Sequence, residues 1–236
     1  MNKKIAVVIP CFKVKAQIGR VIEKLPLNLI NDVFVIDDCC PEESGKFVEN
    51  LIKEKNISNV TIIKNKTNLG VGGATKRGFI EALKNNNDIA IKLDGDDQMD
   101  SKNIQKLIKP LTSENYDYAK GNRFFNLEDL KGMPTIRIFG NSVLALLCKL
   151  STGYWNIFDP TNGYIAINLK VLKLLPLDKI SNSYFFEIDL LFRLSTIKAR
   201  VIDIPMTSIY KDEKSNLKIG KVIFEFSRKL FINFVK

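Results

Sequence analysis

The sequence predicts an α/β fold with a mostly parallel central sheet that helices cover on both faces. In the first hundred residues, short apolar runs rich in β-branched residues alternate with segments whose apolar residues recur at helical spacing. Strict alternation of strand and helix is typical of parallel sheets, and uninterrupted apolar strands are typical of sheets buried on both faces. The length of 236 residues and the hydrophobic content of 45% suffice for one sizeable core.

The predicted elements follow this alternation in order. We expect strands at residues 5–9, 33–36, 60–63 and from 89, separated by helices around residues 18–25, 47–52 and 70–83. After residue 100 we expect a helix ended by Pro110, a strand at 116–120, a loop at 122–133 and a helix from Pro134 to about Leu150. A strand at 165–167, a helix at 185–196 and a strand at 199–204 complete one domain, residues 1–212.

Residues 213–236 form a tail that is predicted to be a basic amphipathic helix. Its apolar side chains fall on one helical stripe: Ile219, Ile223, Phe226, Leu230 and Phe234. A basic helix with Phe on its apolar face suits the interface of an anionic membrane. Packing on the domain, or on a second subunit of a homo-oligomer, explains the same pattern equally well.

The overall charge and the missing histidines limit the classes of function. A net charge of +10 indicates an anionic partner, and no nucleic-acid-binding motif accompanies that charge. The sequence contains no histidine, which excludes His-based acid-base chemistry, His metal sites and Ser-His-Asp triads. The four cysteines lack metal-site spacing, no signal-peptide pattern opens the sequence, and no apolar run approaches the roughly eighteen residues of a membrane span. We therefore expect a cytoplasmic protein.

A cluster of acids follows the fourth predicted strand. Asp94, Asp96 and Asp97 lie within four residues, and such crowding is unfavourable unless a cation or several donors neutralise it. In a parallel sheet the ligand site lies at the carboxyl ends of the strands. Oxygen ligands on one short loop suit Mg²⁺ or Mn²⁺, and Mg²⁺ typically arrives with substrate phosphates. We expect a metal-diphosphate site here.

Two further groups lie at predicted strand ends. Asp37 and Asp38 close the second strand, where an acid can accept hydrogen bonds from a nucleotide or can simply cap a helix. The glycines of the turn at 68–73, including Gly70, would let the backbone approach a ligand, with the following helix N-terminus favouring a phosphate. Lys76 on that helix faces either the diphosphate or solvent.

Seven motifs in order give the sequence a resemblance to a known family over roughly residues 4–210. They are Val8-Ile9-Pro10-Cys11-Phe12, Val35-Ile36-Asp37-Asp38, Asn68-Leu69-Gly70-Val71-Gly72-Gly73-Ala74, Leu93-Asp94-Gly95-Asp96-Asp97-Gln98, Gly121-Asn122-Arg123-Phe124, Asp159-Pro160-Thr161-Asn162-Gly163-Tyr164 and Phe185-Phe186-Glu187-Ile188-Asp189-Leu190-Leu191. Together they resemble family 2 glycosyltransferases of the GT-A fold, most closely the dolichol- or polyprenyl-phosphate sugar synthases. The resemblance implies a Rossmann-like sheet and an inverting, metal-dependent sugar transfer.

The resemblance also implies roles for matched residues. Asp94 and Asp96 correspond to the D-x-D pair, with Asp96 and Gln98 reaching Mg²⁺ or Mn²⁺ and Asp94 near the ribose or the metal. The nucleoside pocket would involve Pro10, Phe12 and one of Asp37 or Asp38. Arg123 corresponds to an arginine that meets phosphate, and Asp159, Asn162 and Glu187 correspond to acceptor-side and sugar-side positions. The sequence has Lys13-Val14-Lys15 where many relatives have Asn-Glu-Glu, so an acid that contacts the nucleoside is missing or moved.

The expected reaction moves a sugar from a GDP- or UDP-linked donor to a polyprenyl or dolichyl phosphate, in the biosynthesis of the cell envelope. A sugar hydroxyl needs a general base, whereas a lipid phosphate, with a second pKa of about 6, is already anionic. Without histidine, a phosphate acceptor is the economical hypothesis, and the basic tail would keep the protein at the inner face of the membrane. Two alternatives remain: extension of a saccharide with Glu187 or Asp189 as base, or a noncatalytic nucleotide-binding scaffold.

Overall fold

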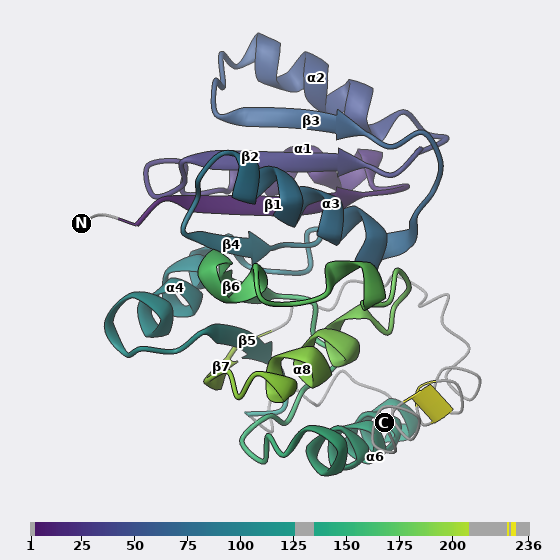
Figure 1. Ribbon diagram of the computed structural model, residues 1–236. Coiled ribbons are helices and arrows are strands. Elements are labelled where there is room, and N and C mark those ends of the chain that lie inside the picture. The colour runs from purple at the N-terminus through teal and green to yellow at the C-terminus, as the bar shows by residue number, and fades with distance from the viewer. Residues whose placement is uncertain (1–2, 126–134, 208–225, 227, 230–236) are drawn as a thin grey trace.

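Seven strands form one sheet in the order β3-β2-β1-β4-β6-β5-β7 (Figure 1). A computed structural model describes residues 3–125, 135–207, 226, 228 and 229. The strands are β1 (Ile5–Cys11), β2 (Asp32–Asp37), β3 (Val60–Lys64), β4 (Ile89–Lys92), β5 (Tyr118–Asn122), β6 (Ile165–Asn168) and β7 (Val201–Pro205). Strands β3, β2, β1 and β4 are parallel, β6 is antiparallel to β4 and β5, and β7 is parallel to β5. The prediction of a mostly parallel sheet is confirmed.

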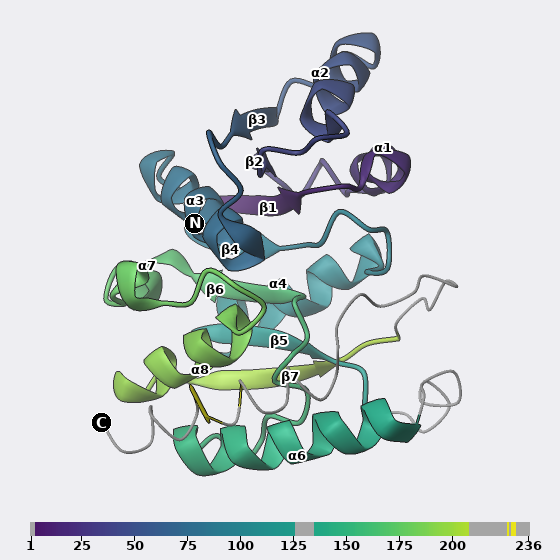
Figure 2. The same ribbon diagram turned by 90° about the vertical axis from the view of Figure 1, so that its right-hand side faces the viewer.

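Helices cover both faces of this sheet, as Figure 2 shows. Helices α1 (Lys15–Glu23), α2 (Ser44–Glu54) and α4 (Ile104–Ser113) contribute to the core on one face. Helices α3 (Gly70–Lys84), α7 (Leu169–Leu172) and α8 (Phe186–Thr196) contribute to the core on the other, and α6 (Thr135–Thr152) packs against α8. Two short 3-10 turns, Ser101–Asn103 and Leu177–Lys179, complete the described elements.

The strand β1 shows why its sequence is apolar throughout. Val7 and Ile9 belong to the core beneath α1 and α2, whereas Ala6 and Val8 belong to the core beneath α3. Because successive side chains of a strand point to opposite faces, a strand buried on both faces needs apolar residues at every position. Each such buried side chain contributes roughly 1.5–3 kcal/mol by leaving water.

Helix α4 corrects one predicted boundary. We expected Pro110 to end this helix, but α4 continues to Ser113 with Pro110 inside it. Proline lacks the N–H that would complete the helical hydrogen bond, so the continuation has to be stabilised by packing. Pro110 and Leu111 are both buried on the sheet, and this burial outweighs the local preference.

Two described residues of the tail contact the domain. Phe226 is 5% exposed, and its ring lies 5.1 Å from that of Phe185 in an edge-to-face arrangement. The ammonium of Lys229 lies 5.2 Å from the centre of the Phe185 ring. Phe226, one residue of the apolar stripe predicted for the tail, therefore packs against the domain. The rest of the predicted tail helix, like the loop at 126–133, lies outside the described residues.

Membrane spans and cysteines were also assessed. Within the described part of the chain, every helix is too short or too polar to cross a bilayer. The four cysteines are unpaired thiols, of which Cys39 is exposed and Cys11, Cys40 and Cys148 are buried.

The sheet order places a crevice at the end of β1. The strands β2 and β3 follow β1 on one side, while β4 pairs with β1 on the other, so the direction of strand order reverses there. Ligands of open α/β sheets bind at such switch points, beyond the carboxyl ends of the strands.

Candidate active site

A pocket of about 650 Å³ lies beyond the carboxyl ends of β1, β2 and β4. This volume is within the range of ligand sites in proteins. Several residues that the sequence singles out line it: Pro10, Phe12, Asp38, Gly70, Asp94, Asp96, Arg123 and Glu187. The fold therefore brings residues from all seven motifs to one cavity, including Thr161 and Gly163 from the Asp159–Tyr164 segment.

Six candidate residues lie outside this lining: Asp37, Lys76, Gln98, Asp159, Asn162 and Asp189. Asp37 is buried, and its carboxylate accepts a hydrogen bond from the Cys40 N–H at 2.8 Å. The ammonium of Lys76 donates to the carbonyl of Ile180 at 2.5 Å and so holds the loop before α8. The structure therefore gives Asp37 and Lys76 bonds within the protein; of the alternatives Asp37 or Asp38 for the nucleoside, Asp38 is the one that lines the pocket, and a donor contact of Lys76 stays a prediction.

Asp38 joins β2 to the glycine turn. Its carboxylate accepts hydrogen bonds from the Asn65 side chain and from the N–H groups of Leu69 and Gly70, each at 2.8 Å. An ionised carboxylate offers about four lone-pair sites, so one site remains for a ligand in the pocket. The N–H groups at the start of α3 are thus hydrogen-bonded by the Asp38 side chain.

The glycines of this turn permit a close approach of protein backbone. The N–H groups of Gly72 and Gly73 donate to the Asn182 carbonyl at 2.9 and 3.2 Å. A Cβ on Gly72 would lie 2.5 Å from the Ser181 carbonyl oxygen and 2.7 Å from the Phe186 side chain. Gly72 and Gly73 thus admit the segment before α8, whereas Gly70 lines the pocket, and its contact with a phosphate stays a prediction.

The acidic loop after β4 divides its three carboxylates. Asp94 and Asp96 line the pocket. Asp97 is buried and pairs instead with Arg20 at 3.1 Å and Lys24 at 2.7 Å, both on or next to α1. Asp96 accepts a hydrogen bond from the Gln98 N–H at 3.1 Å, which fixes the turn of the loop.

Lys92, the last residue of β4, places a charge at the base of the pocket. It is 1% exposed, and its ammonium lies 2.7 Å from Asp94 Oδ1 and 3.1 Å from Glu187 Oε1. Burial alone would lower the pKa of Lys92, but the charges of Asp94 and Glu187 outweigh it and hold the pKa above its ordinary value. Lys92 is therefore a permanent cation at neutral pH.

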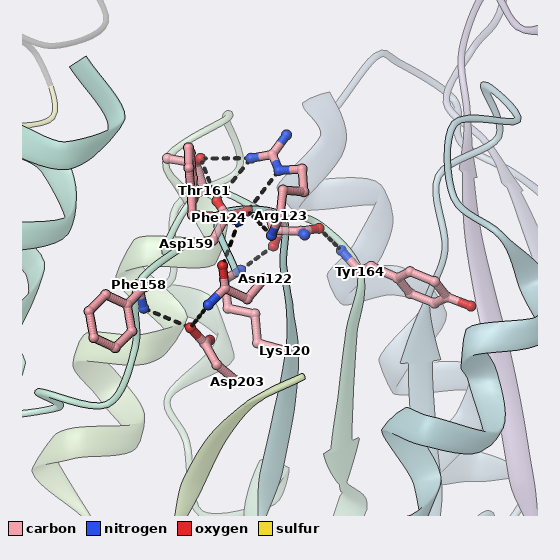
Figure 3. A network of polar contacts seen from close by, with 10 residues as sticks. Lys120, Asn122, Arg123, Phe124, Phe158, Asp159, Thr161, Tyr164 and Asp203 are labelled. Carbon is pink, nitrogen blue, oxygen red and sulfur yellow. Dashed lines mark hydrogen bonds and ion pairs between the residues drawn. The ribbon is translucent and has the colours of Figure 1, made fainter. Parts of the chain in front are cut away.

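Arg123 is held over the pocket by a bidentate ion pair with Asp159 (Figure 3). Its Nε and Nη2 donate to the two Asp159 oxygens at 2.7 and 2.9 Å, and Nη2 also donates to Thr161 at 3.3 Å. Burial would raise the pKa of Asp159, but Arg123 and Lys120 outweigh it and hold the pKa below its ordinary value. Asp159 is fully buried, so it acts on the pocket through Arg123.

A second polar layer lies beneath this pair, as Figure 3 shows. Asp203 accepts hydrogen bonds from the Asn122 side chain at 2.9 Å and from the Phe158 N–H at 2.7 Å. The ammonium of the fully buried Lys120 donates to the Asn162 carbonyl. Burial raises the pKa of Asp203 to about 7 and lowers the pKa of Lys120 to about 8.

Sequence reasoning missed both buried lysines, although a signal existed. Lys92 follows Ile91 and precedes Leu93 in an apolar run, and Lys120 follows Ala119 within a strand. A lysine is almost never fully buried unless it is paired. A lysine inside a strand that is predicted to be buried on both faces therefore indicates acidic partners.

The donor set of the pocket fits a divalent ion that arrives with a phosphorylated substrate. Asp94 and Asp96 supply hard oxygen ligands, while Asp97 is turned away. Among the described residues, no group of three or more acidic, cysteine or histidine side chains is arranged as a metal cage. Mg²⁺ typically uses one or two carboxylates and completes its shell with phosphate oxygens and water.

The fold and the site define an α/β protein of the GT-A type. The family model for Glycosyl transferase family 2 matches residues 6–175, and the chain belongs to this family. It is 27% identical over 237 residues to the UDP-N-acetylglucosamine–dolichyl-phosphate N-acetylglucosaminyltransferase of Methanococcus voltae, with 94% of each chain covered. It is 26% identical to the undecaprenyl-phosphate mannosyltransferase of Micrococcus luteus, with 86% of each chain covered.

Solved structures support the fold. The glucosyl-3-phosphoglycerate synthase of Mycobacterium tuberculosis, crystallised with Mn²⁺, UDP and phosphoglyceric acid, superposes with a TM-score of 0.72. The sequence identity is 17%, and the match covers 99% of this chain and 78% of that one. The protein is a glycosyltransferase, as the resemblance of its motifs implied.

Proposed function

We propose that this glycosyltransferase moves a sugar from a UDP- or GDP-linked donor to a polyprenyl or dolichyl phosphate, with inversion at the anomeric carbon. The observation that carries the proposal is the convergence of two acids, Asp94 and Asp96, with the guanidinium of Arg123 in one pocket, where the buried Lys92 adds a positive charge that is bonded within the protein. Acids that suit a divalent ion beside cations that suit phosphate are what a nucleotide-diphosphate donor requires. The two relatives in Methanococcus and Micrococcus bear names with dolichyl- and undecaprenyl-phosphate acceptors.

The chain's own residues have distinct tasks in this reaction. Pro10 and Phe12 offer an apolar wall for the nucleoside, and Asp38 retains an acceptor site beside them. Asp94 and Asp96 would hold Mg²⁺ or Mn²⁺, which supplies Lewis-acid stabilisation of negative charge on the diphosphate. Arg123, kept in place by Asp159, donates hydrogen bonds to phosphate oxygens. The acceptor oxygen forms the new bond to the anomeric carbon, and the bond to the diphosphate breaks with its electron pair.

The surroundings of Glu187 support a phosphate as the acceptor. A sugar hydroxyl would need a base within hydrogen-bond reach, and the acid best placed for this, Glu187, lies 3.1 Å from the ammonium of Lys92. A phosphate monoester already carries its nucleophilic charge and needs cations and orientation. The pocket supplies both, which favours a lipid phosphate over a saccharide.

A transfer assay tests this proposal. The protein, Mn²⁺ and radiolabelled UDP- and GDP-sugars are incubated with a short polyprenyl phosphate or with the matching polyprenol, and the lipid phase is counted. We expect label only with the phosphate. Asp96→Asn should reduce transfer at least about 10²-fold, the usual cost of removing one stabilising group at a charged transition state. Label on a saccharide acceptor alone would contradict the proposal.

A lipid acceptor also requires access to a membrane surface. Helix α6 contributes Gly140, Asn141 and Leu144 to the pocket, while its residues Ile136, Phe139, Leu146 and Leu150 are exposed. Exposed apolar patches beside a site are typical of membrane or partner contacts. We propose that this face of α6 lies on the membrane at the cytoplasmic side.

Liposome sedimentation tests this orientation. Phe139, which is 67% exposed, is changed to Asp, and binding to vesicles that contain anionic lipid should fall severalfold because a charge in the interface is unfavourable. The matched control is Leu174→Asp, a leucine with 68% exposure beyond α7. Equal losses for the two variants would argue against α6 as the contact.

A further inference from the structure

One residue of the tail lies in the wall of the candidate active site. Phe226 lines the pocket, whereas the other lining residues in the described part of the chain come from residues 10–187. The Phe226 side chain is buried, and it belongs to the same apolar core as Leu144 of α6, which also lines the pocket. At this position the tail is therefore part of the site.

The Phe185 ring, directly before α8, holds this part of the tail in place. Phe185 is buried, and its ring meets that of Phe226 edge to face with the two centres 5.1 Å apart. The ammonium of Lys229 lies 5.2 Å from the centre of the same Phe185 ring. Phe226 and Lys229 are both helical, and residues three positions apart on a helix lie on the same face. Two contacts with one buried ring therefore fix this turn of the tail against the domain.

The wall around Phe226 differs in chemistry from the rest of the pocket. The proposed nucleoside and metal contacts lie at or just beyond the ends of β1, β2 and β4, whereas Leu144 and Phe226 come from α6 and the tail. Isobutyl and phenyl groups neither donate nor accept hydrogen bonds, so a sugar against this wall would leave hydroxyl groups without partners. A hydrocarbon chain has no such groups and gains free energy by leaving water.

We propose that Phe226 and Leu144 form the subsite for the first isoprene units of the lipid acceptor, next to the phosphate that Arg123 binds. The inference rests on the proposed function, because it names the part of the same pocket that receives the chain. Arg123, Leu144 and Phe226 line one cavity, so an amphiphile with an anionic head and an apolar chain finds a partner for each part there. Phe226 is thus a residue that determines acceptor specificity.

A second apolar groove is the alternative place for the chain. It has a volume of about 370 Å³ and is lined by other residues of α6, among them Leu146, and by Trp155 and Phe158. Lys149 also lines this groove, with its ammonium 3.4 Å from the centre of the Phe158 ring. Arg123 does not line it, so a chain whose phosphate lies at Arg123 meets Phe226 within the same cavity and the second groove only outside it.

Binding of farnesyl phosphate and of inorganic phosphate to the full chain, measured by titration calorimetry, tests the inference. The wild type should bind farnesyl phosphate at least about 100-fold more tightly than inorganic phosphate. Phe226→Ala should reduce this preference about tenfold, which is roughly the contribution of one apolar side chain to such a contact. Phe226→Leu keeps an apolar wall and should hold the preference within about threefold of the wild type.

The matched control is Phe47→Ala, which removes a phenyl ring from α2 outside the pocket and should leave both affinities unchanged. Because each variant is compared with itself on two ligands, a change in the phosphate contact alone cancels from the preference. A folded Phe226→Ala with the wild-type preference for farnesyl phosphate would overturn the inference.

Photolabelling of the wild type makes the test independent of whether Phe226→Ala folds. Farnesyl phosphate that carries a diazirine on its second isoprene unit is irradiated with the protein, and the modified residues are identified by mass spectrometry. Label at Phe226 is the expected result. Label that avoids Phe226, for example at Trp155 and Phe158 of the second groove, would contradict the subsite.

Failure of the inference and failure of the proposed function are distinguishable, because the titration needs no donor. A preference for farnesyl phosphate that depends on Phe226, without sugar transfer by the wild type, would leave the lipid-phosphate subsite standing and reject the function. In the transfer assay, Phe226→Ala should raise the KM for the lipid about tenfold with little change in kcat, since the chain is bound equally in the ground and transition states. Transfer to polyprenyl phosphate with an unchanged KM in Phe226→Ala would support the function and reject the subsite.

Discussion

Individual side chains in this pocket are held by partners that never touch a ligand. Arg123 owes its orientation to Asp159, and Asp159 is in turn buried beneath Thr161 and the Arg123 backbone, whose N–H donates to it at 3.2 Å. A fixed guanidinium loses less conformational freedom when it binds a phosphate, and this preorganisation is what makes such contacts effective in catalysis.

Asp159→Asn should therefore impair both stability and activity. The variant leaves the guanidinium without its countercharge, and breaking a buried pair costs about 3–5 kcal/mol. Sugar transfer should fall at least about tenfold, mainly in kcat, because a misplaced phosphate ligand acts on the transition state. Urea unfolding and steady-state kinetics measure the two effects. Thr161→Val, which removes two 3.3 Å hydrogen bonds, one from Arg123 and one to Asp159, and leaves the ion pair intact, is the milder control. Wild-type kinetics in Asp159→Asn would contradict the role of Asp159.

Single elements of the fold are placed by contacts that the sequence only partly reveals. The helical spacing of apolar residues predicts α1, α2, α3 and α8 close to where they occur. It cannot predict that the segment at 181–183 packs on the first turn of α3, because this contact joins residues more than a hundred positions apart. A turn rich in glycine indicates the need for space but not the identity of the neighbour, so the sequence alone predicts a ligand loop and does not reveal the contact with the segment before α8.

Gly72→Ala tests this packing. The new methyl would meet the Ser181 carbonyl and the Phe186 side chain, so the unfolding free energy should fall by about 1–3 kcal/mol. Gly19→Ala in α1 is the control, because its methyl would lie 3.2 Å from the end of the movable Phe47 ring, and alanine favours helix by about 1 kcal/mol. Thermal unfolding compares the two. Equal stability of both variants would show that the α3 contact is loose.

At the scale of the whole molecule, the sequence was a good guide to the sheet and an incomplete one to the site. The four parallel strands and the acids at their ends could be predicted because buried strands and polar strand ends leave a local pattern. The crowding of three acids alone could not tell which carboxylates face the pocket, although the resemblance to the family singled out Asp94 and Asp96. The pairing of Asp97 with Arg20 and Lys24 joins residues far apart in the sequence. The buried lysines were missed because only one of their partners, Asp94, lies near in the sequence, whereas Glu187 beside Lys92 and the Asn162 carbonyl beside Lys120 come from distant segments.

The absence of histidine makes the pH dependence of stability informative. Few ordinary groups titrate between pH 5 and 8 in such a chain. The pKa of Asp203, raised to about 7 by burial, means that the folded state favours its protonated form. The stability from this proton is present at pH values below the ordinary carboxyl pKa of 3.8 and is lost as the pH rises towards 7. The pKa of Lys120 is lowered to about 8, so the folded state favours its neutral form. Its contribution to the free energy of unfolding is present above pH 10.5 and is lost as the pH falls towards 8.

Urea midpoints measured across this range test the assignment. Wild-type stability should decline between about pH 5 and 7, and Asp203→Asn should flatten that decline because the variant has no carboxyl to ionise. The exposed Asp178→Asn should keep the wild-type slope. A decline that persists in Asp203→Asn would place the titrating group elsewhere.

The unequal exposure of the thiols has a practical use. Cys39 is exposed and directly follows Asp38 in the pocket wall, while Cys11, Cys40 and Cys148 are shielded from bulk solvent. Thiol reagents select by exposure, so a maleimide fluorophore should attach at a single place on the natural sequence. Because Cys39 directly follows Asp38, which lines the pocket, we expect the emission of this dye to change when the proposed donor binds, without any engineered cysteine.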